Sequence, residues 1–182
     1  MAIATVRKQN DALWEREVED LFREHYAFMY RAAHALLGRT ADAEDVVQNL
    51  FLKFVQNELR PEVRKNPRGY LCRAAVNESL NIIRSRKRRR ETDGVERLEV
   101  PAPCTGRVND NVRKKLRDAF SEIQPGTLEI LILRYEHGYS DAEIARMFGH
   151  RRGKVAMILS CSRAQLQELM EGKHDETQED RL

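Results

Sequence analysis

Apolar residues recur along most of the chain at the three- and four-residue spacing of amphipathic helices. This spacing predicts a first helix over 13–37 and a second over about 40–60, which should stop before the proline that follows. A third helix is predicted from Pro67, at its first position, to Arg84 or beyond. Three helices with short connections predict a compact helical module over residues 10–90.

A second helical module is predicted over 111–170, after a segment at 91–110 that has no helical period. That segment contains two glycines and two prolines, which is typical of a flexible linker. The last residues, 171–182, are polar and are predicted to be disordered. The predicted fold class is therefore all-α, with two small helical domains joined by a flexible linker.

Residues 140–169 have the pattern of a helix-turn-helix. Ser140 and Glu143 form a capping box at the start of a short helix, and Gly149 supplies a tight turn before a longer helix. Such a unit lays its second helix in the DNA major groove, with the first residues facing the base edges. The predicted duplex-DNA contacts at this leading end are Arg151, Arg152 and Lys154. An ordinary helical hairpin is the alternative.

Charge is distributed unevenly along the chain. The net charge of the 182 residues is +3, yet residues 64–90 carry ten Lys and Arg against one Glu, so the whole surplus lies there. Concentrated positive charge indicates a polyanionic partner, although a solvated basic helix end would have the same composition. No apolar run is long enough to span a membrane, and the first residues have no signal-peptide core. Three widely spaced cysteines suit a reducing cytoplasm, so we expect a cytoplasmic protein without membrane insertion.

Enzymatic patterns are missing from the sequence. The five histidines do not have metal-ligand spacing, and no phosphate-binding glycine loop, nucleophile elbow or Ser-His-Asp pattern occurs. We therefore expect no catalytic residue, no metal and no cofactor. Cys72 and Cys161 are single thiols on predicted helices and are expected to pack as small residues. Tyr70 is expected to pack in the core.

Three blocks of sequence carry a family resemblance. They are ADAEDVVQNLFLKFV (41–55), NPRGYLCRAAVNESLNIIRSRKRRR (66–90) and IQPGTLEILILRYEHGYSDAEIARMFG (123–149). In this order, around a linker, they resemble the extracytoplasmic-function (ECF) sigma factors of bacterial RNA polymerase. The resemblance implies that the first block docks on the polymerase clamp and the second opens and reads the −10 promoter element. The third would begin the helix-turn-helix that reads the −35 element.

This resemblance also implies site residues. The polymerase contacts that it implies are Asp42, Asp45, Gln48 and Phe51. The −10 contacts that it implies are Lys65, Asn66, Arg68, Arg73, Asn77, Asn81 and Arg84. Two of them, Asn77 and Asn81, are four residues apart and share a helix face, where their amides could contact a base edge. The alternative role for the acids is to complement the helix dipole.

The sequence departs from the family pattern at several positions. Ala156 and Ile158 stand where the recognition helix is commonly basic, and Val76 stands where the family often has arginine. Basic residues at the helix start could compensate by shifting the DNA contacts there. Alternatively, Met157, Ile158 and Cys161 face a protein, such as an anti-sigma factor or a polymerase-bound activator.

The resemblance predicts a promoter-specificity subunit without catalytic activity, whose partners are core RNA polymerase and promoter DNA. Two other functions stay open. A stand-alone helix-turn-helix regulator would bind palindromic duplex DNA as a dimer. An RNA-binding or adaptor protein would use the basic run alone, with steep salt dependence. A linker of this composition leaves the two modules either to move independently or to mask one another.

Overall fold

The computed structural model describes residues 2–56, 61–93 and 110–171, and every regular element in these ranges is an α-helix. The N-terminal module consists of α1 (Ala2–Leu37), α2 (Thr40–Gln56), α3 (Pro61–Lys65) and α4 (Pro67–Asp93). The C-terminal module consists of α5 (Asp110–Glu122), α6 (Pro125–Tyr135), α7 (Asp141–Phe148) and α8 (Arg152–Glu171). The all-helical prediction is confirmed. The predicted linker falls almost wholly, and the tail wholly but for its first residue, outside the described ranges.

Local signals fix several of the helix ends. Gly38 follows α1 with a φ of +69°, in the left-handed region that glycine enters without steric cost. Asn66 caps α4, because its side-chain oxygen accepts a hydrogen bond from the backbone N–H of Gly69 at 3.0 Å. Between the second and third predicted helices the structure contains a further short helix, α3. Helix α4 continues to Asp93 and therefore carries the basic run on helical backbone.

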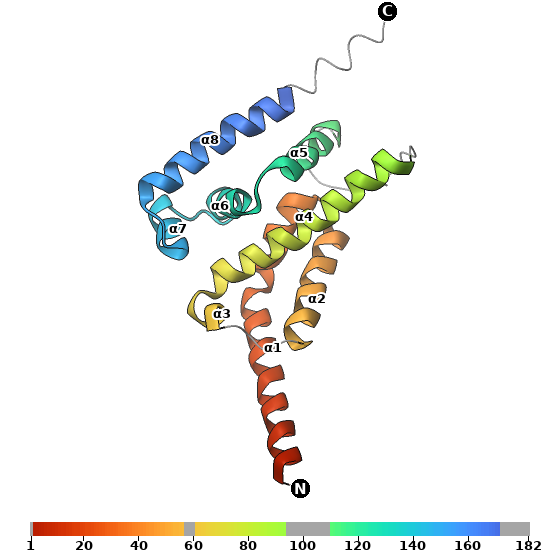
Figure 1. The fold of residues 1–182 in the computed structure, drawn as a ribbon, viewed down its shortest axis with the longest axis vertical. Helices are drawn as coiled ribbons and strands as arrows, with labels where there is room; N and C mark the ends of the chain where they lie inside the picture. The colour runs from red at the N-terminus through yellow and green to blue at the C-terminus, as the bar shows by residue number, and fades with distance from the viewer. Residues whose placement is uncertain (1, 57–60, 94–109, 172–182) are drawn as a thin grey trace, which may run out of the picture.

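The core of the N-terminal module forms where α1 packs along α2 and α4 (Figure 1). Phe22 of α1 meets Phe51 of α2 edge-on, with ring centroids 5.2 Å apart. Tyr70 packs edge-on against Phe54 at the margin of the same core, as predicted. Val76 is completely buried, which explains why this position is apolar: an arginine here would have to place its charge in the core.

The two modules pack against each other along α4. Figure 1 shows α4 between α1 and α2 on one side and α5 and α6 on the other. Buried side chains from both modules form one continuous hydrophobic cluster. Because burial of apolar surface is the main favourable contribution to folding, this shared core holds the modules together. We call this the closed arrangement; it is the one in which the modules mask one another.

No helix in the described ranges is both long enough and apolar enough to cross a membrane.

Candidate nucleic-acid and polymerase interfaces

The helix-turn-helix forms as predicted from α7 and α8. The Ser140 hydroxyl accepts a hydrogen bond from the Glu143 backbone N–H, and the Glu143 carboxylate accepts one from the Ser140 backbone N–H at 2.8 Å, which confirms the capping box. Gly149 ends α7 with a φ of +65°, which turns the chain into α8. Val155 and Leu159 are buried and anchor α8 on the rest of the module.

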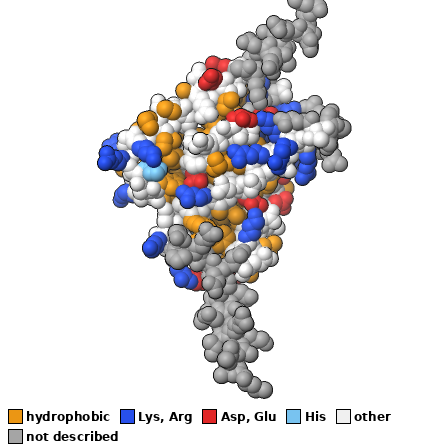
Figure 2. All heavy atoms as spheres, in the orientation of Figure 1, with side chains coloured by type: hydrophobic (Ala, Val, Ile, Leu, Met, Phe, Trp, Pro, Cys, Tyr) orange, Lys and Arg blue, Asp and Glu red, His pale blue; other side chains and the backbone are white. Residues whose placement is uncertain are grey.

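The leading end of α8 is exposed. Arg151, Arg152 and Lys154 all lie on the surface, where their charges can reach a duplex. Figure 2 shows Lys and Arg side chains gathered at this end of the molecule and, separately, toward the C-terminal end of α4. The next turn of α8 is different in character, because Ala156 and Met157 are exposed there and the Met157 side chain is 59% accessible.

The outer face of α2 is a second exposed surface. Asp45 and Gln48 lie on it, whereas Phe51 is half buried against Phe22. Leu52 lies on the same face and is 54% exposed, which makes it one of the few large apolar side chains that the described surface presents to solvent. Leu52 is not among the predicted contacts, although its sequence position offers a signal: it is an apolar residue outside the buried helical period of α2.

Asp42, predicted as a polymerase contact, is buried. Both of its carboxylate oxygens accept hydrogen bonds from the Arg86 guanidinium, at 2.6 and 2.8 Å. These hydrogen bonds, together with the charges of Arg86 and Arg39, lower the pKa of Asp42 below its usual value. In this structure Asp42 ties α2 to α4 and presents little surface to a partner.

The basic face of α4 contacts the C-terminal module through Arg73, whose side chain is still 55% exposed. The Nε of Arg73 donates to the Glu129 carboxylate at 3.1 Å, and the Arg73 guanidinium lies over the ring of Phe148, 5.8 Å from its centroid. Glu129 is only 3% exposed, and this burial raises the pKa of its carboxyl. A buried carboxylate depends on its partner, so Arg73 and Glu129 are the main polar connection between the modules.

Other predicted −10 residues have partners in the C-terminal module as well. The guanidinium of Arg84 donates to the backbone oxygen of Ser121 at 3.3 Å. Beyond it, Arg90 pairs with Asp118 at 2.7 Å, and Lys87 pairs with Glu122. The acidic side chains of α5 thus lie opposite the basic run of α4. Asn77 and Asn81 differ from these residues, because both side chains are exposed.

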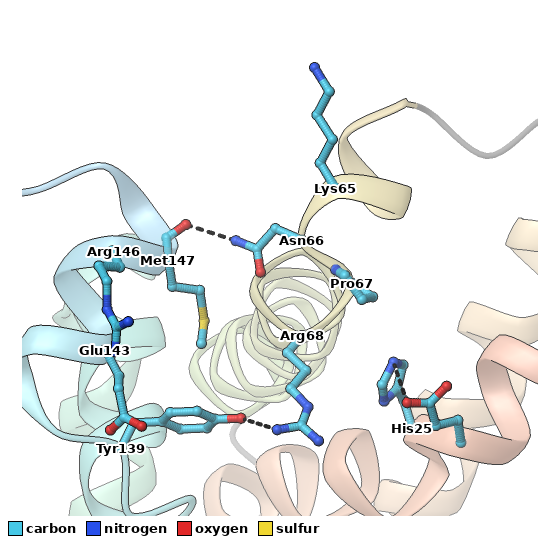
Figure 3. Close-up of a pocket in the computed structure, with 10 residues that line it drawn as sticks. His25, Lys65, Asn66, Pro67, Arg68, Tyr139, Glu143, Arg146 and Met147 are labelled. Atoms are coloured by element: carbon cyan, nitrogen blue, oxygen red, sulfur yellow. Dashed lines mark hydrogen bonds and ion pairs between the residues drawn. The ribbon is translucent and has the colours of Figure 1, made fainter.

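A cavity of about 620 Å³ opens where the start of α4 meets α7 and α1 (Figure 3). At its rim the Asn66 side-chain amide donates to the backbone oxygen of Met147 at 2.7 Å, and Arg68 donates to the Tyr139 hydroxyl at 2.8 Å. Lys65 points away from the cavity in this view. Two of the predicted −10 residues therefore hold the modules together here, and the third is exposed.

His137 of the C-terminal module packs against α1. Its ring stacks on Phe28 with centroids 3.9 Å apart, and its Nδ1 is 3.1 Å from the Arg31 guanidinium. Burial, assisted by the charges of Arg31 and Arg68, lowers the pKa of His137 to about 4. The buried Nε2 has no hydrogen-bond partner within the described residues. The closed arrangement therefore favours the neutral imidazole.

The thiols are placed differently from each other. Cys72 is buried, as predicted, and burial raises the pKa of its thiol. Cys161 is exposed on α8, contrary to the expectation that it packs as a small residue, because it lies on the face opposite Val155 and Leu159. Among the described residues no cluster of His, Cys, Asp and Glu is arranged to hold a metal ion.

Comparisons with known proteins agree on one family. Residues 21–89 match the family Sigma-70 region 2. Over 156 residues the chain is 30% identical to the ECF RNA polymerase sigma factor SigL of Mycobacterium tuberculosis. The aligned region covers 82% of this chain and 88% of SigL. The chain is also 28% identical over 167 residues to the ECF RNA polymerase sigma factor SigE of Mycolicibacterium smegmatis. That aligned region covers 87% of this chain and 63% of SigE.

A solved structure has a similar fold. It is that of the sigma factor RpoE from Bartonella quintana, crystallised in complex with the anti-sigma factor NepR. The TM-score is 0.51 at 23% sequence identity, over 86% of this chain and 98% of that one. At this level of identity the likeness concerns the fold alone.

Proposed function

This chain belongs to the ECF sigma factors of RNA polymerase, and from that premise we propose how its surfaces divide the work of transcription initiation. As a member of this family it is a non-enzymatic factor that directs RNA polymerase in transcription initiation. In our proposal the outer face of α2 binds core polymerase, the basic face of α4 reads and melts the −10 element, and α8 reads the −35 element. In this proposal the protein acts in the cytoplasm, where it binds the polymerase.

Polymerase binding is assigned to the outer face of α2 because this face combines charge with accessible apolar surface. Asp45 and Gln48 offer polar contacts, and Leu52 offers an apolar one that is costly to leave in water. Figure 1 shows α2 and the C-terminal module on opposite sides of α4, and all three side chains are exposed in the closed arrangement. Polymerase could therefore bind before the modules separate.

The −10 role is assigned to one face of α4. The side chains on it are Arg73, Asn77, Asn81 and Arg84, with Lys65, Asn66 and Arg68 around the start of the helix. Arginines neutralise backbone phosphates, and asparagine amides supply both a donor and acceptors for a base edge. Because Glu129, Ser121 and Tyr139 occupy the arginines, the closed arrangement has to open before this face meets DNA.

The −35 role is assigned to α8 on its geometry. It is the second helix of a capped helix-turn-helix, and its first residues are exposed and basic. The assigned contacts are Arg151, Arg152 and Lys154. One observation carries the proposal: the same chain contains this helix-turn-helix, the basic helix α4 and the exposed acidic and apolar face of α2. A dimeric regulator needs the helix-turn-helix but neither of the other two surfaces.

Reconstitution tests the proposal. The purified full-length chain is mixed with bacterial core RNA polymerase, the complex is isolated by gel filtration, and genomic fragments are transcribed in run-off format. We expect co-elution and new transcription start sites that share a −10 and −35 pair. Binding to palindromic duplex DNA without co-elution would contradict the proposal and favour the stand-alone regulator.

A variant of α2 assigns the polymerase contact. Asp45→Arg combined with Gln48→Ala should abolish co-elution and leave the helical content unchanged, because both side chains are exposed. Glu168→Arg makes the same change of charge on an exposed residue near the end of α8 and should co-elute normally. Normal co-elution of the α2 variant would overturn the assignment of this face.

We also propose an anti-sigma factor as a partner of this chain. RpoE of Bartonella quintana was crystallised with one, and for this chain the proposal rests on its own exposed Met157 and Leu52. A regulator that covers either side chain would block DNA or polymerase. Pull-down with the tagged chain, compared with Met157→Gln and Leu52→Gln variants, would test which face such a protein uses.

A further inference from the structure

The recognition helix presents an apolar patch where a DNA-reading helix usually presents hydrogen-bonding groups. On the proposed function of α8 as the −35 reader, we infer that Ala156 and Met157 read thymine methyl groups in the major groove. The specificity of the −35 element would then be divided along the helix. Arginine donors act at the leading end, and apolar contacts act one turn later.

The position of the two side chains supports this role. Helix α8 begins at Arg152, so Ala156 and Met157 lie in its second turn, within reach of a base edge when the helix start enters the groove. Both are exposed, and Met157 at 59% is among the most accessible large apolar side chains that the structure describes. The buried anchors Val155 and Leu159 fix which face of the helix points outward.

The charge around the patch favours DNA as its occupant. Between Glu143 and Glu168 the sequence contains no acidic residue, while Arg146, Arg151, Arg152, Lys154 and Arg163 all lie in this stretch. All five of these basic side chains are exposed. A stretch with an apolar centre, basic flanks and no acidic residue of its own matches a major groove lined by phosphates.

The side-chain chemistry then selects the base. Ala156 and Met157 have no hydrogen-bond donor, so they cannot recognise guanine O6 and N7 or adenine N6 and N7. The feature of the major groove that an apolar side chain recognises is the C5-methyl group of thymine. We therefore expect A·T pairs opposite the second turn of α8 and guanine opposite Arg151 or Arg152.

The test uses the reconstituted holoenzyme. A library of promoters with a randomised −35 element is first selected for open-complex formation. Each thymine of the selected −35 element is then replaced by deoxyuridine, which removes only the methyl group. We expect the loss of a methyl at one or two adjacent positions to lower affinity about fourfold, as for one methyl group left in water.

A variant links that loss to the protein. Met157→Gln holoenzyme should lose the fourfold difference at the thymine that Met157 contacts, whereas the control Gln165→Ala, also exposed on α8, should retain it. Equal affinity of wild-type holoenzyme for the two promoters, or a selected element without A·T pairs there, would overturn the inference and assign the patch to a protein partner. A failure of the proposed function is distinguishable, because then no promoter of the library forms a complex.

Discussion

The two basic surfaces of this sigma factor differ in whether acidic groups of the same chain pair with them. The face of α4 lies against the C-terminal module, with Arg73 on the buried Glu129 and Arg90 on Asp118. The leading end of α8 is exposed, and Arg151 and Arg152 lie on the surface. The arginines proposed to handle melted DNA are paired with groups of the C-terminal module, whereas the basic residues proposed to bind duplex DNA lie open on the surface.

Complementary acids explain the difference. Helices α5 and α6 place Asp118, Glu122 and Glu129 opposite the basic run of α4, whereas no acidic residue lies between Glu143 and Glu168 around α8. Positive charge alone therefore does not make a surface available to DNA. What decides availability is whether the same chain supplies the counter-charge.

Removing the open surface should have the largest effect. Arg151→Ala with Arg152→Ala should lower promoter affinity of the holoenzyme about a hundredfold, because each base contact contributes about 1–3 kcal/mol. Electrophoretic mobility shift with the selected promoter measures this. Arg16→Ala with Arg23→Ala removes the same charge from exposed positions of α1 and should change affinity little. Equal effects of the two variants would mean that α8 attracts DNA only through net charge.

Unmasking the α4 face should have the next largest effect. Glu129→Lys places a like charge beside Arg73 at a site that is 3% exposed, so the modules should separate. We expect the isolated chain to bind single-stranded −10 DNA about tenfold or more tightly, measured by fluorescence anisotropy. Glu168→Lys is the charge-matched control on α8.

Folding of the Glu129→Lys variant is checked by circular dichroism, and Glu129→Gln provides a milder variant that keeps the shape of the side chain. Because burial raises the pKa of Glu129, the neutral form is favoured in the closed arrangement, and Glu129→Gln should bind −10 DNA no more tightly than the wild type. If Glu129→Lys folds and also binds −10 DNA like the wild type, the closed arrangement does not mask this face.

Acid should open the modules by a smaller amount through His137. Its pKa is lowered from 6.5 to about 4 in the closed arrangement, so the stability it supports is complete above pH 6.5 and is lost as the pH falls toward 4. We expect the separation of the modules to increase several-fold between pH 7 and pH 5, measured by energy transfer between dyes on the two modules.

The His137→Gln variant isolates this effect. Burial raises the pKa of Glu129, so protonation of Glu129 favours the closed arrangement, and that contribution is lost as the pH rises through the raised pKa. Without His137, acid should therefore close the modules rather than open them. An unchanged pH profile in the variant would show that His137 is not the group that responds.

The exposed ion pairs should contribute least. Lys87 pairs with Glu122 at the margin of the interface, where water and salt screen the attraction. Lys87→Ala should change −10 binding by the isolated chain less than about threefold, since exposed pairs contribute about 0.2–1 kcal/mol. An effect as large as that of Glu129→Lys would contradict the ranking of buried above exposed contacts.

Local features of the fold could be predicted from the sequence. The capping box of Ser140 and Glu143, the asparagine cap at Asn66 and the turns at Gly38 and Gly149 depend on residues within a few positions of each other. The same holds for the exposed basic start of α8, which follows directly from the helix-turn-helix pattern.

The closed arrangement could not be predicted, because it joins residues that are 56 positions apart in the pair Arg73–Glu129 and 71 apart in the pair Arg68–Tyr139. Periodicity along one helix contains no information on such contacts. One signal did exist: Glu129 is the single charged residue in the apolar run 128–133, and a charge there needs a partner from elsewhere. The burial of Asp42 could not be predicted for the same reason, since its partner Arg86 lies on another helix.

The masked α4 face is tested most directly by following the distance between the modules as core polymerase binds. Cys161 on α8 is exposed and accepts one dye, a cysteine introduced at the exposed Arg89 of α4 accepts the other, and Cys104 is replaced by serine. Buried Cys72 is protected from labelling. We predict high energy transfer in the isolated chain and a large fall on addition of core polymerase. Transfer that is low from the start, or that stays high in the holoenzyme, would contradict the account.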